Sequence, residues 1–534
     1  MTRTRTALAL AAASVLLLTG CAAGADPDAG GEAAAGEEPR SGGVLQIAMS
    51  ADYSCLDGQQ ARGGELNIAS QILDGLTAQD PETGEIVPHL AESWDISDDA
   101  SEFTFHLRDG VTFHDGTPFT AQSVKANLEG IANLGARSSL GQTYVDGLKE
   151  IEAVDDHTVR IAFEGPNAQF LQATSTTTLG FYADATLALS AEERCQGDVI
   201  GTGPFAFEAY TGNTTVELVR NDDYDWAPEQ ITAHQGPAYL EGLTFVVMPE
   251  ASVRNGSLQS GQIDVNSGVS VQDRATLDAQ GFPVHTYSNP GAPTNLWINV
   301  TQEPLDDVRV RQAITHALDR EELASVVFEE QEPATNTVSS STPGYQSQED
   351  LLAYDPELAG ELLDEAGWEL GADGVREKDG QPLKVRITDY YKYNYTELIQ
   401  AHLARVGIDA EIQTVTFSER SAILENGEYQ IITGNLTRAD ADIIRTIHSI
   451  DQQNTNQRED SVPLDQELAD TLAVVDETAR AELLTGDVSR ALLEEGYAIP
   501  MVETLAVIGT GKDVEGFAFD ATARQKYYDT WLTE

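Results

Sequence analysis

A short apolar run that ends in a cysteine lies near the start of this chain. It indicates in which compartment the protein folds and after which residue the folded part can begin. Two arginines precede an apolar stretch over residues 7–18, and Leu18-Thr19-Gly20-Cys21 closes it. A transmembrane helix needs about 20 apolar residues, so this run is too short and has the layout of an export signal. We expect residues 1–20 to be a lipoprotein signal peptide and Cys21 to carry a diacylglycerol, which anchors a protein stably. The alternative is an ordinary cleaved signal followed by a chance cysteine.

The stretch after the cysteine predicts a tether. Residues 21–43 are almost entirely Ala, Gly, Asp, Glu and Pro, and no side chain is large enough to start a core before Val44. Such a composition stays disordered. The residues that remain suffice for two or three packed units. The predicted localisation is the extracytoplasmic face of a bacterial cell membrane.

Composition narrows the classes of partner. The 88 acidic and 31 basic residues give a formal net charge of -57 at pH 7. Nucleic acid is excluded, because phosphate binding depends on clustered Lys and Arg, and anionic lipid is repelled. The charge could focus a cationic substrate, but we favour a solvated acidic surface, because net charge reports on solubility rather than on a site.

Two cysteines, Cys55 and Cys195, stand outside the export signal. An even pair in an oxidising compartment favours a disulfide over two free thiols. The pair lacks C-x-x-C spacing and a nearby histidine, which argues against redox or zinc chemistry. We predict a structural disulfide.

The apolar periodicity changes along the chain. The first half mixes antiparallel strands with helices, whereas the later half alternates strand, helix and strand, which predicts a parallel pair closed by a right-handed crossover. The predicted strands are 44–49, 103–107, 151–154, 159–163, 383–387, 408–415 and 429–433. The predicted helices carry apolar residues over 66–76, 124–131, 310–318, 358–366 and 398–406, with Thr120, Asp307 and Asp355 as N-terminal caps of the middle three.

Motifs of an exported hydrolase are missing from the sequence. It contains no H-E-x-x-H, G-x-S-x-G or P-loop, and none of its nine histidines lies three or four residues from another. Gly201-Thr202-Gly203 follows a polar stretch and therefore fails as a dinucleotide fingerprint. We expect a protein that is not an enzyme and that uses neither a cofactor nor a metal.

Five blocks of sequence, in order, carry a resemblance to a known family. They are LDGLTAQDPETGEIVPHLAESW (73–94), FTFHLRDGVTFHDGTPFTAQSV (103–124), GTGPF (201–205) with VRNDDYDW (219–226), DDVRVRQAITHALDR (306–320) and YDPELAGELLDEAGW (354–368). Together they resemble the extracellular solute-binding protein family 5, the peptide- and nickel-binding class that serves ABC importers.

The resemblance implies an α/β fold: a two-lobed periplasmic-binding-protein clamshell with an additional inserted α+β domain. Lobe one would comprise 44–77, 199–290 and 500–534, the inserted domain 78–198, and lobe two 291–499. The expected partners are a small-molecule or oligopeptide ligand, ABC permease subunits and, through the lipid anchor, the membrane; we expect a monomer. Hinge closure would capture the ligand. The alternatives are a ligand-sensing or adhesive lipoprotein on the same scaffold and, less favoured, an exported hydrolase.

Loops that follow predicted strands are the expected ligand contacts, because ligands bind beyond the carboxyl ends of strands in open α/β sheets. The first two such loops contribute Asp52, Tyr53, Tyr390 and Tyr391. Tyrosines give a cleft apolar area with a hydrogen-bonding edge, although packing explains this cluster equally well. Trp297, in the strand that opens lobe two, could reach the cleft or lie in the core.

The third loop, residues 434–442, contributes Asn435, Thr437, Arg438 and Asp440. Peptide binders of the family commonly hold the substrate amine with the aspartate of a W-x-x-D pattern. Here the tryptophan position falls on Gly434 and the aspartate position on Thr437, so this chain departs from the peptide pattern. Arg438 and Asp440 become the charged groups best placed to meet a polar substrate, unless they pair with each other.

Overall fold

The computed structural model describes residues 38–51, 55–61, 63–327, 331–390, 393–460 and 462–533, apart from the side chains of residues 271, 272, 417 and 418. Several predictions lie outside this described part. They concern the signal peptide, most of the tether, Cys21, Asp52, Tyr53 and Tyr391.

A seven-stranded mixed sheet forms around the first predicted strand. In spatial order its strands are β12 (Val284–Ser288), β21 (Leu505–Thr510), β11 (Val265–Asn266), β1 (Val44–Met49), β10 (Gly242–Val247), β9 (Thr215–Arg220) and β8 (Phe205–Thr211). β1 has the predicted bounds and pairs in parallel with β10 and with β11. Apart from Val44 at its start, its apolar side chains are buried, as expected of a strand with neighbours on both sides.

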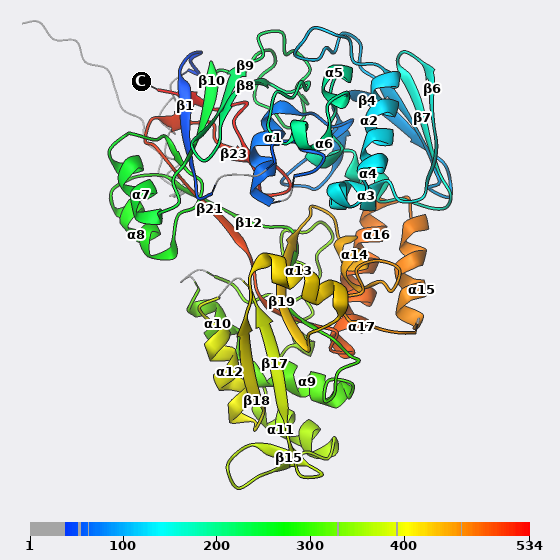
Figure 1. Cartoon of the computed structure of the whole chain (residues 1–534), viewed down its shortest axis with the longest axis vertical. Coiled ribbons are helices and arrows are strands. Elements are labelled where there is room, and N and C mark those ends of the chain that lie inside the picture. The colour runs from blue at the N-terminus through cyan, green and yellow to red at the C-terminus, as the bar shows by residue number, and fades with distance from the viewer. Residues whose placement is uncertain are drawn as a thin grey trace, which may run out of the picture. The chain divides into compact units, whose positions relative to one another are not determined.

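A five-stranded sheet holds the later half of the chain. Its order is β18 (Asp409–Thr414), β17 (Lys384–Asp389), β19 (Ile431–Thr437), β13 (Gly291–Ile298) and β20 (Ala498–Val502). β17 and β18 run parallel, and the helix α12 (Thr396–Arg405) joins them and packs against β18 (Figure 1). This is the predicted strand-helix-strand unit. All eight residues of β13 are buried.

The third large sheet has four antiparallel strands. Its order is β4 (Ala91–Ile96), β5 (Glu102–Leu107), β7 (Thr158–Phe163) and β6 (Leu148–Asp155). Alternate residues of β5 and β7 are buried, which matches the predicted alternation. The helix α2 (Ala121–Leu134) begins after Thr120, whose side chain takes part in a capping box with Ser123.

Shorter strands and the remaining helices complete the described part. The strands are β2 (Thr77–Gln79), β3 (Ile86–Pro88), β14 (Glu369–Leu370), β15 (Arg376–Lys378), β16 (Gln381–Pro382), β22 (Val514–Glu515), β23 (Ala518–Phe519), β24 (Gln525–Lys526) and β25 (Trp531–Leu532). The helices are α1 (Leu66–Ile72), α3 (Ser139–Tyr144), α4 (Phe170–Ala173), α5 (Asp184–Leu187), α6 (Ala191–Arg194), α7 (Ala251–Gln259), α8 (Val271–Ala279), α9 (Val308–Ala317), α10 (Arg320–Ser325), α11 (Pro356–Glu365), α13 (Phe417–Asn426), α14 (Ile443–His448), α15 (Pro463–Asp470), α16 (Glu477–Leu483) and α17 (Ser489–Glu494).

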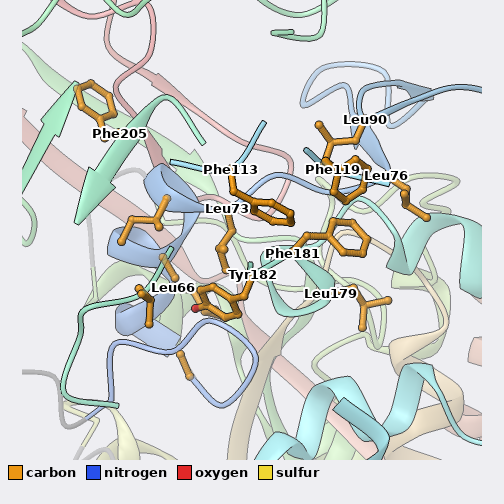
Figure 2. Close-up of a cluster of buried hydrophobic side chains, with 14 of the residues drawn as sticks. Leu66, Leu73, Leu76, Leu90, Phe113, Phe119, Leu179, Phe181, Tyr182 and Phe205 are labelled. Carbon is orange, nitrogen blue, oxygen red and sulfur yellow. The ribbon is translucent and has the colours of Figure 1, made fainter. Parts of the chain in front are cut away.

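The helix α1 is shorter than its apolar spacing predicts. It ends at Ile72, because Leu73 adopts an extended conformation with φ -119° and ψ 141°. Leu73 and Leu76 are nevertheless buried and join a large apolar cluster that also contains Phe113, Phe119 and Phe181 (Figure 2). The apolar pattern therefore identified core residues correctly but not the end of the helix.

The glycines of the GTGPF block allow the chain to pass closely by the end of α1. A Cβ atom on Gly201 would lie 2.2 Å from the carbonyl oxygen of Ile72, and one on Gly203 would lie 2.6 Å from that of Gln71. No ordinary side chain fits at such distances, so glycine is required at both positions. The Gly203 amide donates to the Ile72 carbonyl at 2.8 Å.

The first sheet takes all seven strands from the segments that we assigned to lobe one. The boundary that we placed between residues 499 and 500 falls inside β20, however. That strand continues to Val502, because it pairs with β13 as far as the contact between Thr294 and Val502.

Candidate functional site

A cavity of about 190 Å³ lies where segments far apart in the sequence meet. One buried water needs about 10–15 Å³ of such space, so the cavity has room for a small organic molecule. Its walls come from residues 77–81, Tyr144 at the end of α3, residues 175–178, residues 437–439 at the end of β19, and residues 518–526, which include the β23–β24 hairpin. The cavity thus draws on the second sheet and on segments that accompany the other two sheets.

Arg438 is the buried charge in the wall that β19 provides. Its side chain is 3% exposed. Its Nε donates to the Tyr144 hydroxyl at 3.2 Å, and its Nη1 donates to Thr446 Oγ1 at 2.7 Å. The guanidinium also lies over the Tyr144 ring, 4.7 Å from the centroid. Its Nη2 is buried and has no hydrogen-bond partner among the described residues.

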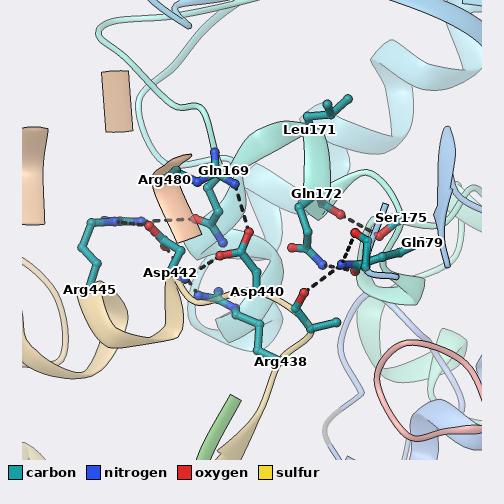
Figure 3. A network of polar contacts seen from close by, with 12 residues as sticks. Gln79, Gln169, Leu171, Gln172, Ser175, Arg438, Asp440, Asp442, Arg445 and Arg480 are labelled. Atoms are coloured by element: carbon teal, nitrogen blue, oxygen red, sulfur yellow. Dashed lines mark hydrogen bonds and ion pairs between the residues drawn. The ribbon is translucent and has the colours of Figure 1, made fainter. Parts of the chain in front are cut away.

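A buried ionic network stands directly behind Arg438 (Figure 3). Asp442 accepts two hydrogen bonds of 3.0 Å from Arg445 and lies 3.8 Å from Arg438 Nη1. Asp440 instead pairs with Arg480 at 3.1 Å. The possibility that Arg438 and Asp440 pair with each other is therefore wrong, because each carboxylate of the network is already engaged by a different arginine.

Three hydrogen bonds tie this part of the chain to segments earlier in the sequence. Arg438 reaches Tyr144, and Arg445 Nη2 donates to Gln169 Oε1 at 3.2 Å. Gln79 Nε2 donates to the Ala439 carbonyl at 2.9 Å (Figure 3). Of the residues in these contacts, Gln79, Tyr144, Arg438 and Ala439 line the cavity.

The β23–β24 hairpin brings a second guanidinium to the cavity. Asp520 accepts hydrogen bonds from the backbone amides of Thr522 and Arg524, which sets the tight turn at the tip. Arg524 is half-buried, its Nη1 donates to the Thr522 hydroxyl, and its Nε has no partner within the described ranges. Burial lowers the pKa of Arg524, whereas Asp520 and Tyr144 act in the opposite direction.

The carboxylates of the cavity have donors of their own. Asp74 accepts from Trp226 Nε1 at 3.0 Å, and Asp529 accepts from His234 Nδ1 at 2.7 Å. His89 lies 3.5 Å from Asp74, but burial lowers the pKa of its ring to about 4, so the ring is neutral at pH 7. Both carboxylates line the cavity, but they already bond to other groups of the protein.

The cavity contains two of the residues predicted to contact a ligand, Thr437 and Arg438. The structure does not bring Asn435, Tyr390 or Asp440 to it. The prediction of a loop from residue 434 onward is wrong, because β19 continues to Thr437 and pairs with β13 up to Gly291.

Trp297 belongs to an apolar core and is not part of the cavity wall. It is 1% exposed and packs among apolar residues of the second sheet and its helices. Its ring lies against Gly434, where a Cβ atom would come within 2.2 Å of Trp297 Cζ3. Arg420 stacks over Tyr390 at 4.7 Å and over Trp297 at 5.9 Å, so this aromatic group forms a separate cluster.

Two functional candidates escaped the sequence analysis, Tyr144 and Arg524. The D-x-T-x-R pattern over 520–524 is a turn signal and could have marked the hairpin tip. No local signal could have placed it beside β19. The structure also joins Cys55 to Cys195 in a disulfide, across 140 residues of sequence.

The described ranges lack two kinds of feature. They contain no cluster of three or more His, Cys, Asp and Glu side chains that could hold a metal ion. No helix in this part of the chain combines the length and the apolar character needed to cross a bilayer.

The mixed α/β sheets, and a cavity lined by polar and apolar groups to which the second sheet contributes, fit a solute-binding protein. The model of the family "Bacterial extracellular solute-binding proteins, family 5 Middle" matches residues 85–456. The chain belongs to this family, and its fold is the expected periplasmic-binding-protein fold.

Curated relatives and solved structures agree with this assignment. The chain is 30% identical to the dipeptide-binding protein of Escherichia coli over 66% of this chain and 67% of that protein. It is 28% identical to the nickel-binding periplasmic protein of the same organism over 78% and 81%, respectively. The structure of NikA from Brucella suis in complex with Fe(III)-EDTA has a TM-score of 0.79 at 26% identity, covering 92% of this chain and 100% of that one. Both curated relatives are binding proteins by name, and the nickel-binding one is periplasmic.

Proposed function

We propose that this protein captures a small polar solute, a peptide or another compound, at the outer face of the cell membrane and delivers it to an ABC permease. The capture step is closure of the second sheet onto the segments that carry Tyr144 and the β23–β24 hairpin. Lipid attached to Cys21 would hold the protein near its permease.

The observation that carries this proposal is the cavity and the contacts between the segments that form it. Its walls come from separate segments, and three hydrogen bonds, those of Arg438, Arg445 and Gln79, join the segment after β19 to earlier parts of the chain. A ligand that contacts both sides of such a cavity favours the closed state over the open one. Relatives that bind a dipeptide, nickel or Fe(III)-EDTA indicate that the family's scaffold serves several ligand classes.

Native mass spectrometry of protein purified without refolding tests the proposal. We expect a bound small molecule at a stoichiometry of one, which survives gentle purification and is released on denaturation. Its removal should increase the radius of gyration measured by X-ray scattering, and its return should reverse the change. A protein with no bound molecule, whose radius stays constant when extracts of growth medium are added, would contradict a receptor role.

The anchor and the disulfide are tested separately. Mass analysis of membrane-extracted protein should find a diacylglyceryl group on the residue at position 21, and Cys21→Ala should release the protein from the membrane. Unreduced, denatured protein should bind no alkylating reagent at Cys55 or Cys195. Two alkylated cysteines would refute the disulfide.

A further inference from the structure

We propose that Arg438 and Arg524 form an oxyanion subsite in the cavity, which selects ligands that carry a carboxylate or a phosphate. The inference rests on the proposed receptor function and deepens it by naming the ligand class. It also means that a strongly acidic protein uses a local cationic site to recognise an anion.

The first support is the balance of charge behind Arg438. In the buried network of the described residues, three guanidinium groups, those of Arg438, Arg445 and Arg480, face the carboxylates of Asp440 and Asp442. Buried charges are costly unless they are paired. Asp442 contacts Arg445 at 3.0 Å and Arg438 only at 3.8 Å, so Arg438 is the least compensated of the three.

Glu477 does not remove this imbalance. Its charge acts on Arg480 and on Asp440, and burial raises its pKa to about 7, so it is about half protonated at neutral pH. Arg438 therefore remains the arginine of this network with the longest contact to a carboxylate.

The second support is the position of Arg524. It lines the same cavity from the β23–β24 hairpin, whereas Arg438 lines it from β19. Tyr144 lines the cavity as well, and the positive charges of both arginines lower the pKa of its hydroxyl, which burial otherwise raises. Two cations from different walls thus converge on one group.

The third support is the hydrogen-bonding capacity that the cavity leaves unused. Arg438 Nη2 and Arg524 Nε are donors without acceptors among the residues described. The carboxylates of Asp74, Asp520 and Asp529, in contrast, already accept hydrogen bonds from protein groups. Free donors on guanidinium groups match the oxygens of a carboxylate or a phosphate. Among the described residues of this cavity, these three carboxylates therefore have protein donors, whereas the two guanidinium groups each keep a donor without a partner.

Three matched peptide sets test the inference. All are N-acetylated tripeptides: one set has free carboxyl termini, one is amidated, and one is amidated and carries phosphoserine. Native mass spectrometry of equimolar mixtures measures which sets the protein retains. We expect the carboxylate or the phosphate set to exceed the neutral set by at least about tenfold, which is the worth of one charge-assisted hydrogen bond.

Substitutions assign that preference to residues. Arg524→Gln and Arg438→Gln should each lower the ratio of retained anionic peptide to retained neutral peptide towards one. Arg490→Gln changes an ion-pair arginine outside the cavity and should leave this ratio unchanged. Circular dichroism checks that the variants fold. If Arg438→Gln does not fold, Arg524→Gln still tests the inference, because Arg524 is only half-buried. The set that is retained tells carboxylate from phosphate.

Equal retention of the neutral set, retention of no set, or a preference that survives both substitutions would overturn the inference. Failure of the receptor function gives a different result, since the purified protein would then carry no ligand of any charge. A neutral or cationic ligand recovered from the cell would leave the receptor intact and remove the oxyanion subsite.

Discussion

Gly434 illustrates how a missing side chain fixes the position of a large one. A Cβ atom there would lie 2.2 Å from Trp297 Cζ3 and 2.6 Å from Cη2, and Trp297 is fully buried. Overpacking of a buried site costs about 1–3 kcal/mol. We therefore expect Gly434→Ala to lower the free energy of unfolding by that amount, measured from the midpoint of urea denaturation.

Gly256→Ala is the matched control, because a Cβ atom on Gly256 in α7 would meet no atom within 4 Å. Alanine is favoured over glycine in a helix by about 0.5–1 kcal/mol, so this variant should be as stable as the wild type or slightly more so. If Gly434→Ala unfolds at the same urea concentration as Gly256→Ala, the packing of Trp297 against Gly434 is not as tight as the structure has it.

Residue-scale prediction from the sequence works where the cause is local. Asp307 and Asp355 were predicted as helix caps, and each accepts hydrogen bonds from backbone amides within three residues of itself. The partners of Arg438 could not be predicted, because Tyr144 lies 294 residues away in sequence. The sequence led us to expect that Arg438 meets a polar substrate, but it could not name the protein residues that Arg438 contacts.

At the scale of elements, the cap of α11 makes a direct test. Asp355 accepts hydrogen bonds from the amides of Glu357 and Leu358, and Pro356 occupies the first turn. Removing an N-cap aspartate costs about 1 kcal/mol, partly through lost interaction with the helix dipole. Asp355→Ala should lower the stability by about that amount in urea denaturation. Glu361→Ala, an exposed acid within the same helix, should not, and an equal loss in both would argue against capping.

Apart from the end of α1, the helices with a clear apolar period were predicted to within about three residues of their bounds, since periodicity reports directly on which face is buried. β19 shows the limit of this approach. Its second half reads Gly-Asn-Leu-Thr, a composition typical of a turn, yet it continues as a strand to Thr437. Pairing with β13, through Gly434 with Asn295 and Thr437 with Gly291, supplies the hydrogen bonds that the local sequence does not foretell.

At the scale of the whole molecule, the family could be predicted from five ordered blocks, but the site could not. Its walls combine the ends of α3 and β19 with a hairpin near the C-terminus. None of these three segments carries a binding motif in its own sequence. Only tertiary packing makes Arg438 and Arg524 neighbours of the same tyrosine, and no periodicity encodes that.

Glu477 couples this packing to pH. Burial raises its pKa from 4.5 to about 7, and the charges of Asp440, Asp476 and Glu85 act in the same direction, whereas that of Arg480 opposes them. Glu85 comes from a segment nearly 400 residues earlier in the chain, so this environment exists only in the assembled molecule. Unfolding returns the carboxyl group to its ordinary pKa.

The sign of the pH dependence follows from this difference. Between about pH 4.5 and 7 the folded state holds a proton that the unfolded state has released, so rising pH favours unfolding. The stabilising contribution is complete below pH 4.5 and is lost as the pH passes 7. For this half-buried group we expect a loss of about 2 kcal/mol in the wild type relative to Glu477→Gln. Urea midpoints at pH 5 and pH 8 measure it, with Glu482→Gln on the same helix as control. Parallel pH profiles of the wild type and Glu477→Gln would contradict the raised pKa, because a glutamine cannot release the proton on which the difference depends.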